Sequence, residues 1–148
     1  MLLRKANAVW EGDLKGGKGV MLFPGYEGPY TYLSRFVDST GINPEILLGA
    51  AHAGCFSMAF ANALATAGFT PTKVETEATV KMAMDNGPKI SEIHLDCSAK
   101  VTGIDPERFQ QIAEDAKINC PVSVALKAVE ITLEAGDRKS TRLNSSHT

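Results

Sequence analysis

The chain has 148 residues, of which 44% are hydrophobic, which is enough for one domain with a hydrophobic core. Its formal net charge of -2 provides no basic surface of the kind that binds nucleic acid or an anionic membrane, so we expect neither partner. We also expect no signal peptide and no membrane-spanning segment, and therefore a cytoplasmic protein.

The cysteines and the end of the chain each set a further limit. Three cysteines is an odd number without the spacing of a disulfide scaffold, so we expect reactive or buried thiols instead of structural disulfides. Residues 137–148 break away from the hydrophobic pattern that precedes them. We therefore expect a single domain over residues 1–136, followed by a non-native or disordered tail over residues 137–148.

The first part of the chain predicts three strands. Residues 6–11 and 19–23 flank a link rich in glycine and aspartate, which is typical of a β-hairpin. Glycines and prolines over residues 24–29 predict a turn-rich loop. Aromatic and β-favouring residues over 30–36 predict a third strand, with Arg35 near its end.

A long helix is the clearest element of the sequence. Asn43 is a favourable N-cap, and Gly68 is a typical residue to follow the last turn. Between residues 46 and 64 the only ionisable side chains are His52 and Cys55. We therefore expect this helix to be buried on most sides, at the centre of the fold.

The segment after this helix predicts a second hairpin. Residues 74–82 alternate between apolar and polar side chains, and a turn at 85–88 leads into a similar return strand over 92–101. Cys97 falls on the apolar face of the return strand, so we expect it in the core. His94 falls on the polar face, so we expect it to be solvated.

Two helices and a strand complete the pattern. Asp105 is the N-cap of a helix that runs to about residue 118. Cys120 is the expected N-cap of a short helix over residues 122–126, and residues 129–133 predict a final strand. Because helices and strands do not alternate regularly, the predicted fold class is α+β with antiparallel sheet.

Two of the cysteines lie in distinctive motifs. Cys55 stands ten residues after Glu45 in the run Asn43–Met58, which reads NPEILLGAAHAGCFSM. Cys120 opens the second motif, which reads CPVS. Together these motifs resemble the OsmC/Ohr family of organic hydroperoxide-reducing thiol peroxidases, and in particular its OsmC (osmotically inducible protein C) branch. The resemblance extends over residues 6–134.

The resemblance implies a fold and a reaction. The fold is α+β and OsmC/Ohr-like, with antiparallel sheets packed around the long central helices of an intertwined homodimer. In the reaction, the Cys55 thiolate attacks a hydroperoxide and becomes a sulfenate, and Cys120 then forms a Cys55–Cys120 disulfide. Arg35 and Glu45 match the family's ion pair, which directs a guanidinium at the reactive thiolate.

The resemblance also implies the partners of the reaction. Organic hydroperoxides are the implied substrates, with hydrogen peroxide reduced less well, and a dithiol such as a lipoylated protein is the implied reductant. No cofactor and no metal are expected for this chemistry. Phe36, Phe56 and Met58 would suit an apolar approach for an alkyl substrate, and they would equally suit a core.

Simple electrostatics and helix geometry constrain this site further. Apolar surroundings raise the pKa of a cysteine, so Cys55 needs a nearby cation to be reactive, and Arg35 is the best candidate. Ten helical residues rise about 15 Å, so Glu45 cannot reach Cys55 of its own helix. If Arg35 and Glu45 serve Cys55, part of the site must come from another subunit. A partner subunit would also cover the long uncharged helix, which a chain of this size cannot enclose alone.

Other classes of function fit the sequence less well. A zinc site would need three or four closely spaced ligands, whereas the cysteines and histidines are scattered. A cysteine hydrolase would need a histidine base, but His52 lies three residues before Cys55 on the same helix, and we expect it to be structural. A non-catalytic dithiol redox sensor, or a ligand-binding protein on the same fold, remains an alternative.

Overall fold

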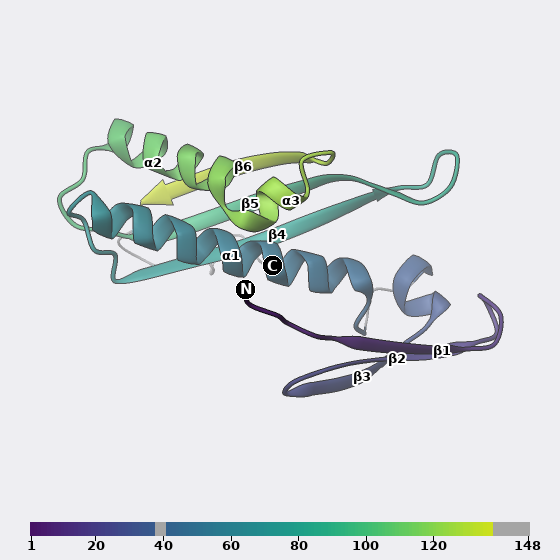
Figure 1. Ribbon diagram of the computed structural model, residues 1–148. Coiled ribbons are helices and arrows are strands. Elements are labelled where there is room, and N and C mark those ends of the chain that lie inside the picture. Colours follow the sequence, from purple (N-terminus) through teal and green to yellow (C-terminus); the bar gives the residue numbers. More distant parts are fainter. Residues whose placement is uncertain (38–40, 138–148) are drawn as a thin grey trace. The chain divides into compact units, whose positions relative to one another are not determined.

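The computed structural model describes residues 1–37 and 41–137, which form two compact units that divide between Leu47 and Leu48. Each unit contains one three-stranded sheet (Figure 1). Separate sheets and helices of this kind confirm the α+β class. The single domain over residues 1–136 stays a prediction. The predicted tail lies outside the described residues except for Asp137, which ends a strand.

The sheet of the first unit begins with the expected hairpin. Strands β1 (Asn7–Glu11) and β2 (Lys18–Phe23) pair antiparallel, which confirms the sequence prediction. A tight turn at Pro24 and Gly25 then leads into β3 (Tyr26–Tyr30), which pairs antiparallel with β2. Gly25 has a φ of +88°, a left-handed conformation that glycine adopts at little cost.

The predicted strand over residues 30–36 is wrong. Strand β3 ends at Tyr30, and Leu33–Val37 form a short π-helix, η1, which carries Arg35. The reason is local capping: Ser34 N donates to Thr31 Oγ1 at 3.1 Å, and Thr31 N donates to Ser34 Oγ at 2.9 Å. Such reciprocal bonds satisfy the first backbone donors of a helical turn, so they favour a turn over an extended strand.

The long helix α1 (Pro44–Thr66) has the predicted caps. Asn43 Oδ1 accepts a hydrogen bond from Ile46 N at 2.8 Å, and Asn43 Nδ2 donates to Ser34 O at 2.8 Å. At the other end, Gly68 has a φ of +98°, which lets the chain leave the helix in a left-handed conformation. The predicted start and end of this helix are therefore confirmed.

Burial of α1 differs from the expectation. One face is fully buried and carries Phe56, Phe60 and Leu64, but Ile46 is 44% exposed and Met58 is 77% exposed. In a single chain the helix is therefore covered on one face only. By length and composition α1 could also cross a membrane, which the sequence analysis did not expect, although the core helix of a soluble protein passes the same test.

The second unit is built on a long hairpin. Strands β4 (Lys73–Ala83) and β5 (Lys89–Lys100) pair antiparallel, as predicted, and the chain turns between them through left-handed backbone at Asn86 and Gly87. The apolar face of β5 is fully buried and carries Leu95 and Cys97. The predicted inward face of this strand, and the place of Cys97 in the core, are thus confirmed.

The last strand runs in a direction that the sequence analysis did not foresee. Helices α2 (Pro106–Asn119) and α3 (Pro121–Ala125) precede β6 (Glu130–Asp137), as predicted. However, β6 pairs with β5 in parallel, so the prediction of antiparallel sheets is confirmed for the other strand pairs and is wrong for β6. A parallel return needs a long crossover, and residues 101–129 with their two helices provide it.

The core of the second unit lies between its helices and its sheet (Figure 1). The rings of Phe60 from α1 and Phe109 from α2 meet edge to face, with centroids 5.3 Å apart. On β4, Thr76 Oγ1 lies 2.7 Å from Ser57 Oγ of α1. These contacts hold the middle of α1 against both α2 and the sheet, which fixes the place of Cys55.

We expect Asn43→Ala to lower the free energy of unfolding by about 1–2 kcal/mol, because it removes the N-cap of α1 and the bond to Ser34. Urea denaturation followed by circular dichroism, at one fixed protein concentration, measures the change. Asn119→Ala is the matched control, because Asn119 is exposed and bonds only Asp115 O among the described residues. An equal loss in both variants would contradict the role of this cap.

Candidate active site

Two of the predicted site residues, Cys55 and Cys120, meet in the second unit. Cys55 lies in the middle of α1 and is partly buried, whereas Cys120 is 1% exposed and stands between α2 and α3. Cys120 is the C-cap of α2 and, as predicted, the N-cap of α3. Both thiols are free, and they lie within hydrogen-bonding reach of each other. The structure thus juxtaposes a pair of thiols that are far apart in the sequence.

The surroundings of Cys55 act on its pKa in opposite directions. Burial is the largest effect, and it raises the pKa of the Cys55 thiol above its ordinary value. A hydrogen bond from the backbone of Val122, in α3, lowers this pKa, and the neighbouring Cys120 thiol raises it again. Burial prevails, so Cys55 needs a further positive group beside it to become a thiolate at neutral pH.

Cys120 has polar neighbours that the sequence analysis missed. Ser123 N donates to Cys120 Sγ at 3.5 Å, and Ser123 Oγ lies 3.4 Å from the same sulfur. Ser123 Oγ in turn lies 2.8 Å from His52 Nε2 of α1. His52 is fully buried, and burial lowers its pKa, so the imidazole is neutral. The position of Ser123 three residues after the N-cap Cys120 is the sequence signal that could have revealed the contact between Ser123 and Cys120.

The other two predicted site residues, Arg35 and Glu45, meet in the first unit. Arg35 Nε donates to Glu45 Oε1 at 3.1 Å, and Arg35 Nη2 donates to Glu45 Oε2 at 3.0 Å. The side chain of Glu45 is 11% exposed and that of Arg35 is 37% exposed. This two-pronged bond fixes the plane of the guanidinium and leaves part of it open to solvent.

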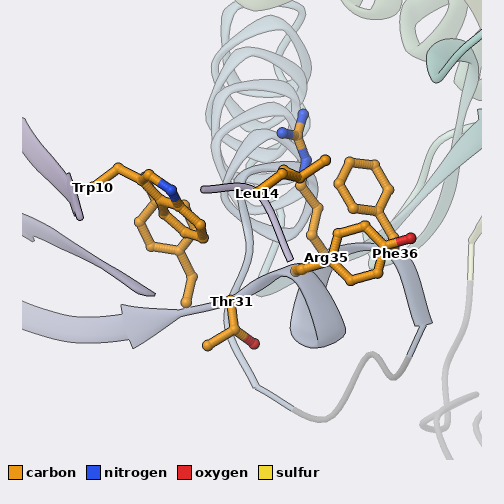
Figure 2. A pocket seen from close by; sticks show the side chains of 7 residues that line it. Trp10, Leu14, Thr31, Arg35 and Phe36 are labelled. Carbon is orange, nitrogen blue, oxygen red and sulfur yellow. The ribbon is translucent and has the colours of Figure 1, made fainter. Parts of the chain in front are cut away.

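A pocket of about 220 Å³ adjoins Arg35 in the first unit, and Figure 2 shows the side chains that surround it. It is mostly aromatic, and its lining residues are Trp10, Leu14, Tyr30, Thr31, Tyr32, Arg35 and Phe36. Phe36 therefore lines a cavity, as one reading of the sequence allowed. Phe56 is fully buried in the core of the second unit, and Met58 is exposed.

The remaining candidate ligands do not converge. His94 lies on the sheet of the second unit, where its Nδ1 is 2.6 Å from Thr132 Oγ1. Its Nε2 is 3.9 Å from Glu134 Oε1. Residues 1–37 and 41–137 contain no group of three or more histidine, cysteine, aspartate or glutamate side chains that could hold a metal ion.

Comparison with known proteins bears on this arrangement. Residues 37–134 match the family described as OsmC-like protein. Over 135 residues the chain is 47% identical to the protein named Peroxiredoxin OsmC from Escherichia coli (strain K12), which covers 88% of this chain and 94% of that one. Two free thiols that lie beside each other are typical of a thiol-based redox protein. The chain belongs to the OsmC family, which confirms the resemblance seen in the sequence.

Two solved structures show the same fold. The organic hydroperoxide resistance protein OhrB of Bacillus subtilis matches with a TM-score of 0.69 at 22% identity, over 89% of this chain and 98% of that one. An organic hydroperoxide resistance protein OsmC from Legionella pneumophila matches with a TM-score of 0.71 at 19% identity, over 92% and 99%. At these identities the likeness establishes the fold.

We expect the mild thiol oxidant diamide to join Cys55 to Cys120, because these sulfurs are already neighbours. Mass spectrometry of a non-reduced digest identifies the linked peptides. The Cys97→Ala chain is the control and should form the same bridge, because Cys97 is packed in the core on β5. A bridge that contains Cys97 in the unsubstituted chain would contradict the pairing.

Proposed function

We propose that this chain reduces organic hydroperoxides to alcohols through a Cys55 sulfenate and a Cys55–Cys120 disulfide. Its membership of the OsmC family, at 47% identity to Peroxiredoxin OsmC, makes the chain a peroxidase. The observation that carries the proposed roles is the contact between the Cys55 and Cys120 thiols. Cys55 is the more accessible of the two, which supports its role as the thiol that meets the peroxide.

The proposed cycle has three balanced steps. The Cys55 thiolate attacks the distal oxygen of the hydroperoxide, the O–O bond breaks, and the alcohol leaves with a proton while Cys55 becomes a sulfenic acid. Cys120 then attacks the sulfenyl sulfur, which forms the disulfide and releases water. A dithiol reduces the disulfide and returns both thiols.

Activation of Cys55 requires a cation, and we assign it to Arg35. Burial raises the pKa of Cys55, and the hydrogen bond from Val122 only partly opposes this effect. An arginine stays charged at all relevant pH values, and Glu45 holds the guanidinium of Arg35 in one orientation. Such a fixed cation can stabilise both the thiolate and the negative charge that develops on the peroxide oxygen.

We further propose a homodimer whose partner subunit supplies Arg35 and Glu45 to each Cys55. Two features support it. Glu45 precedes Cys55 by ten residues in one helix, a rise of about 15 Å, so Glu45 cannot reach the Cys55 thiol of its own chain. The exposed apolar side chains of α1, among them Ile46 and Met58, provide a face that a second copy would cover in an intertwined dimer.

The proposed substrate and reductant follow from the same chemistry. The aromatic pocket beside Arg35 supports an organic hydroperoxide over hydrogen peroxide, because its lining favours an apolar group. The reductant is a dithiol, and a lipoylated protein has the required pair of neighbouring thiols. We place this cycle in the cytoplasm, where cellular dithiols keep such a protein reduced.

We expect Cys55→Ser to abolish hydroperoxide consumption in the presence of a dithiol, because it removes the attacking sulfur. Cys120→Ser should accumulate Cys55 sulfenic acid, which dimedone traps and mass spectrometry detects. Cys97→Ser is the matched control and should retain the activity. A chain that forms the disulfide once but does not turn over would instead support the dithiol sensor.

We expect Arg35→Ala to slow oxidation of Cys55 by about 100-fold or more, because the thiolate loses its cation. Arg108→Ala is the control, since Arg108 stacks over the Phe69 ring elsewhere and should leave the rate unchanged.

Mixing the subunits tests the dimer. If Arg35 acts across subunits, co-expressed Arg35→Ala and Cys55→Ser chains should recover about a quarter of the normal activity. A lack of recovery, or a fully active monomer, would argue against the shared site.

A further inference from the structure

His52, Ser123 and Cys120 form a continuous chain of polar contacts that the proposed cycle does not use. His52 Nε2 lies 2.8 Å from Ser123 Oγ, and Ser123 Oγ lies 3.4 Å from Cys120 Sγ. All three side chains are buried: His52 is fully buried, Cys120 is 1% exposed and Ser123 is 5% exposed. The contacts join α1, which also carries Cys55, to the start of α3.

The direction of these hydrogen bonds follows from the second nitrogen of the imidazole. His52 Nδ1 is buried and has no hydrogen-bond partner among the described residues. A neutral imidazole carries one hydrogen, and an N–H group that is buried without a partner is rarer in proteins than an unpaired acceptor. The hydrogen therefore belongs on Nε2, which donates to Ser123 Oγ. The hydroxyl hydrogen of Ser123 is then free to point at Cys120 Sγ.

We propose that His52 is a positioning residue for the resolving step, because its Nε2–H holds the Ser123 hydroxyl in the orientation that donates to the Cys120 sulfur. This inference rests on the proposed role of Cys120 as the resolving thiol. The backbone N–H of Ser123 donates to the same sulfur at 3.5 Å, so Cys120 receives two hydrogen bonds from one residue.

The resolving reaction explains why these donors matter. The Cys120 sulfur attacks the sulfenyl sulfur of Cys55, so an S–S bond forms while the S–O bond breaks. The Cys120 sulfur is oxidised, the Cys55 sulfur is reduced, and the departing oxygen leaves as water with the proton that Cys120 loses. Negative charge builds on the Cys120 sulfur before the new bond is complete. Fixed donors in a buried site stabilise this charge without having to reorganise.

Two observations distinguish positioning from other roles of His52. Burial lowers the pKa of His52, which makes the imidazole a weak proton acceptor and argues against a general base. A purely structural role does not explain a histidine at this place, because one buried ring nitrogen is left without a hydrogen-bond partner among the described residues, which lowers stability. An apolar side chain would fill this place without that cost, and it would leave Ser123 without orientation.

The experiment separates the two chemical steps. Each variant is mixed with one equivalent of an organic hydroperoxide, quenched with dimedone at successive times, and analysed for sulfenic acid and disulfide by mass spectrometry. We expect His52→Ala and Ser123→Ala each to slow disulfide formation by about 10-fold, because Cys120 loses an oriented donor. The rate of Cys55 oxidation should stay within about 2-fold of the unsubstituted chain. The double variant should be no slower than either single variant, because both act through one path.

Two conservative variants test the geometry of the donor. In His52→Gln the amide nitrogen can reach the place of Nε2, so a normal rate of disulfide formation should return. In His52→Asn the side chain is too short, so the rate should remain as slow as in His52→Ala. The control is Ser91→Ala, which removes an exposed hydroxyl hydrogen bond to Lys81 O between β5 and β4 and should leave both rates unchanged.

The possible outcomes also separate this inference from the proposed function. If the unsubstituted chain forms no Cys55–Cys120 disulfide with hydroperoxide, the proposed function itself fails. If the disulfide forms and His52→Ala resolves at the normal rate, or His52→Gln is as slow as His52→Ala, only the positioning role is overturned. Should His52→Ala not fold, Ser123→Ala decides the question, because it removes the same oriented hydroxyl with a smaller change in volume.

Discussion

The chemistry that we propose depends on one contact, that between the middle of α1 and the junction of α2 and α3. On α1, Cys55 and Phe56 lie three and four residues after His52, so the three side chains share the buried face of the helix. Phe56 is locked into the core, His52 bonds Ser123, and Cys55 meets Cys120. Packing, a polar link and the pair of thiols therefore belong to the same interface, and a shift of α1 would disturb all three.

Burial in this interface makes the Cys55 thiol less reactive. The burial that places Cys55 beside Cys120, its proposed resolving partner, also favours the neutral thiol, because burial raises the pKa of Cys55. The backbone N–H groups of the short helix α3 offer part of the compensation: Val122 hydrogen-bonds Cys55, and Ser123 N–H hydrogen-bonds Cys120. The first turn of α3 thus serves both sulfurs. The remaining compensation requires a full positive charge, which is the role that we propose for Arg35.

Local features of the fold could be predicted from the sequence, and long-range ones could not. The caps Asn43 and Cys120 are recognisable because their partners lie within a few residues. The direction of β6 cannot be predicted from its residues, because a strand has the same alternation of apolar and polar side chains whether its neighbour is parallel or antiparallel. The bond from His52 to Ser123 spans 71 residues, so no short motif reveals it. For the candidate site, the motifs pointed to the two cysteines and to the Arg35 and Glu45 pair, but only the structure showed the polar neighbours of Cys120.

The parallel pairing of β6 also orders the events of folding. β4 and β5 are joined by a short turn, so they can pair at a small cost in loop-closure entropy. β6 reaches β5 only after residues 101–129 have crossed the sheet, and such distant pairing is slow. The crossing segment carries Cys120, so the thiol that we propose as the resolving one arrives in the same late event as the edge strand. A newly made chain therefore passes through a stage in which Cys55 has no thiol beside it and is open to irreversible oxidation.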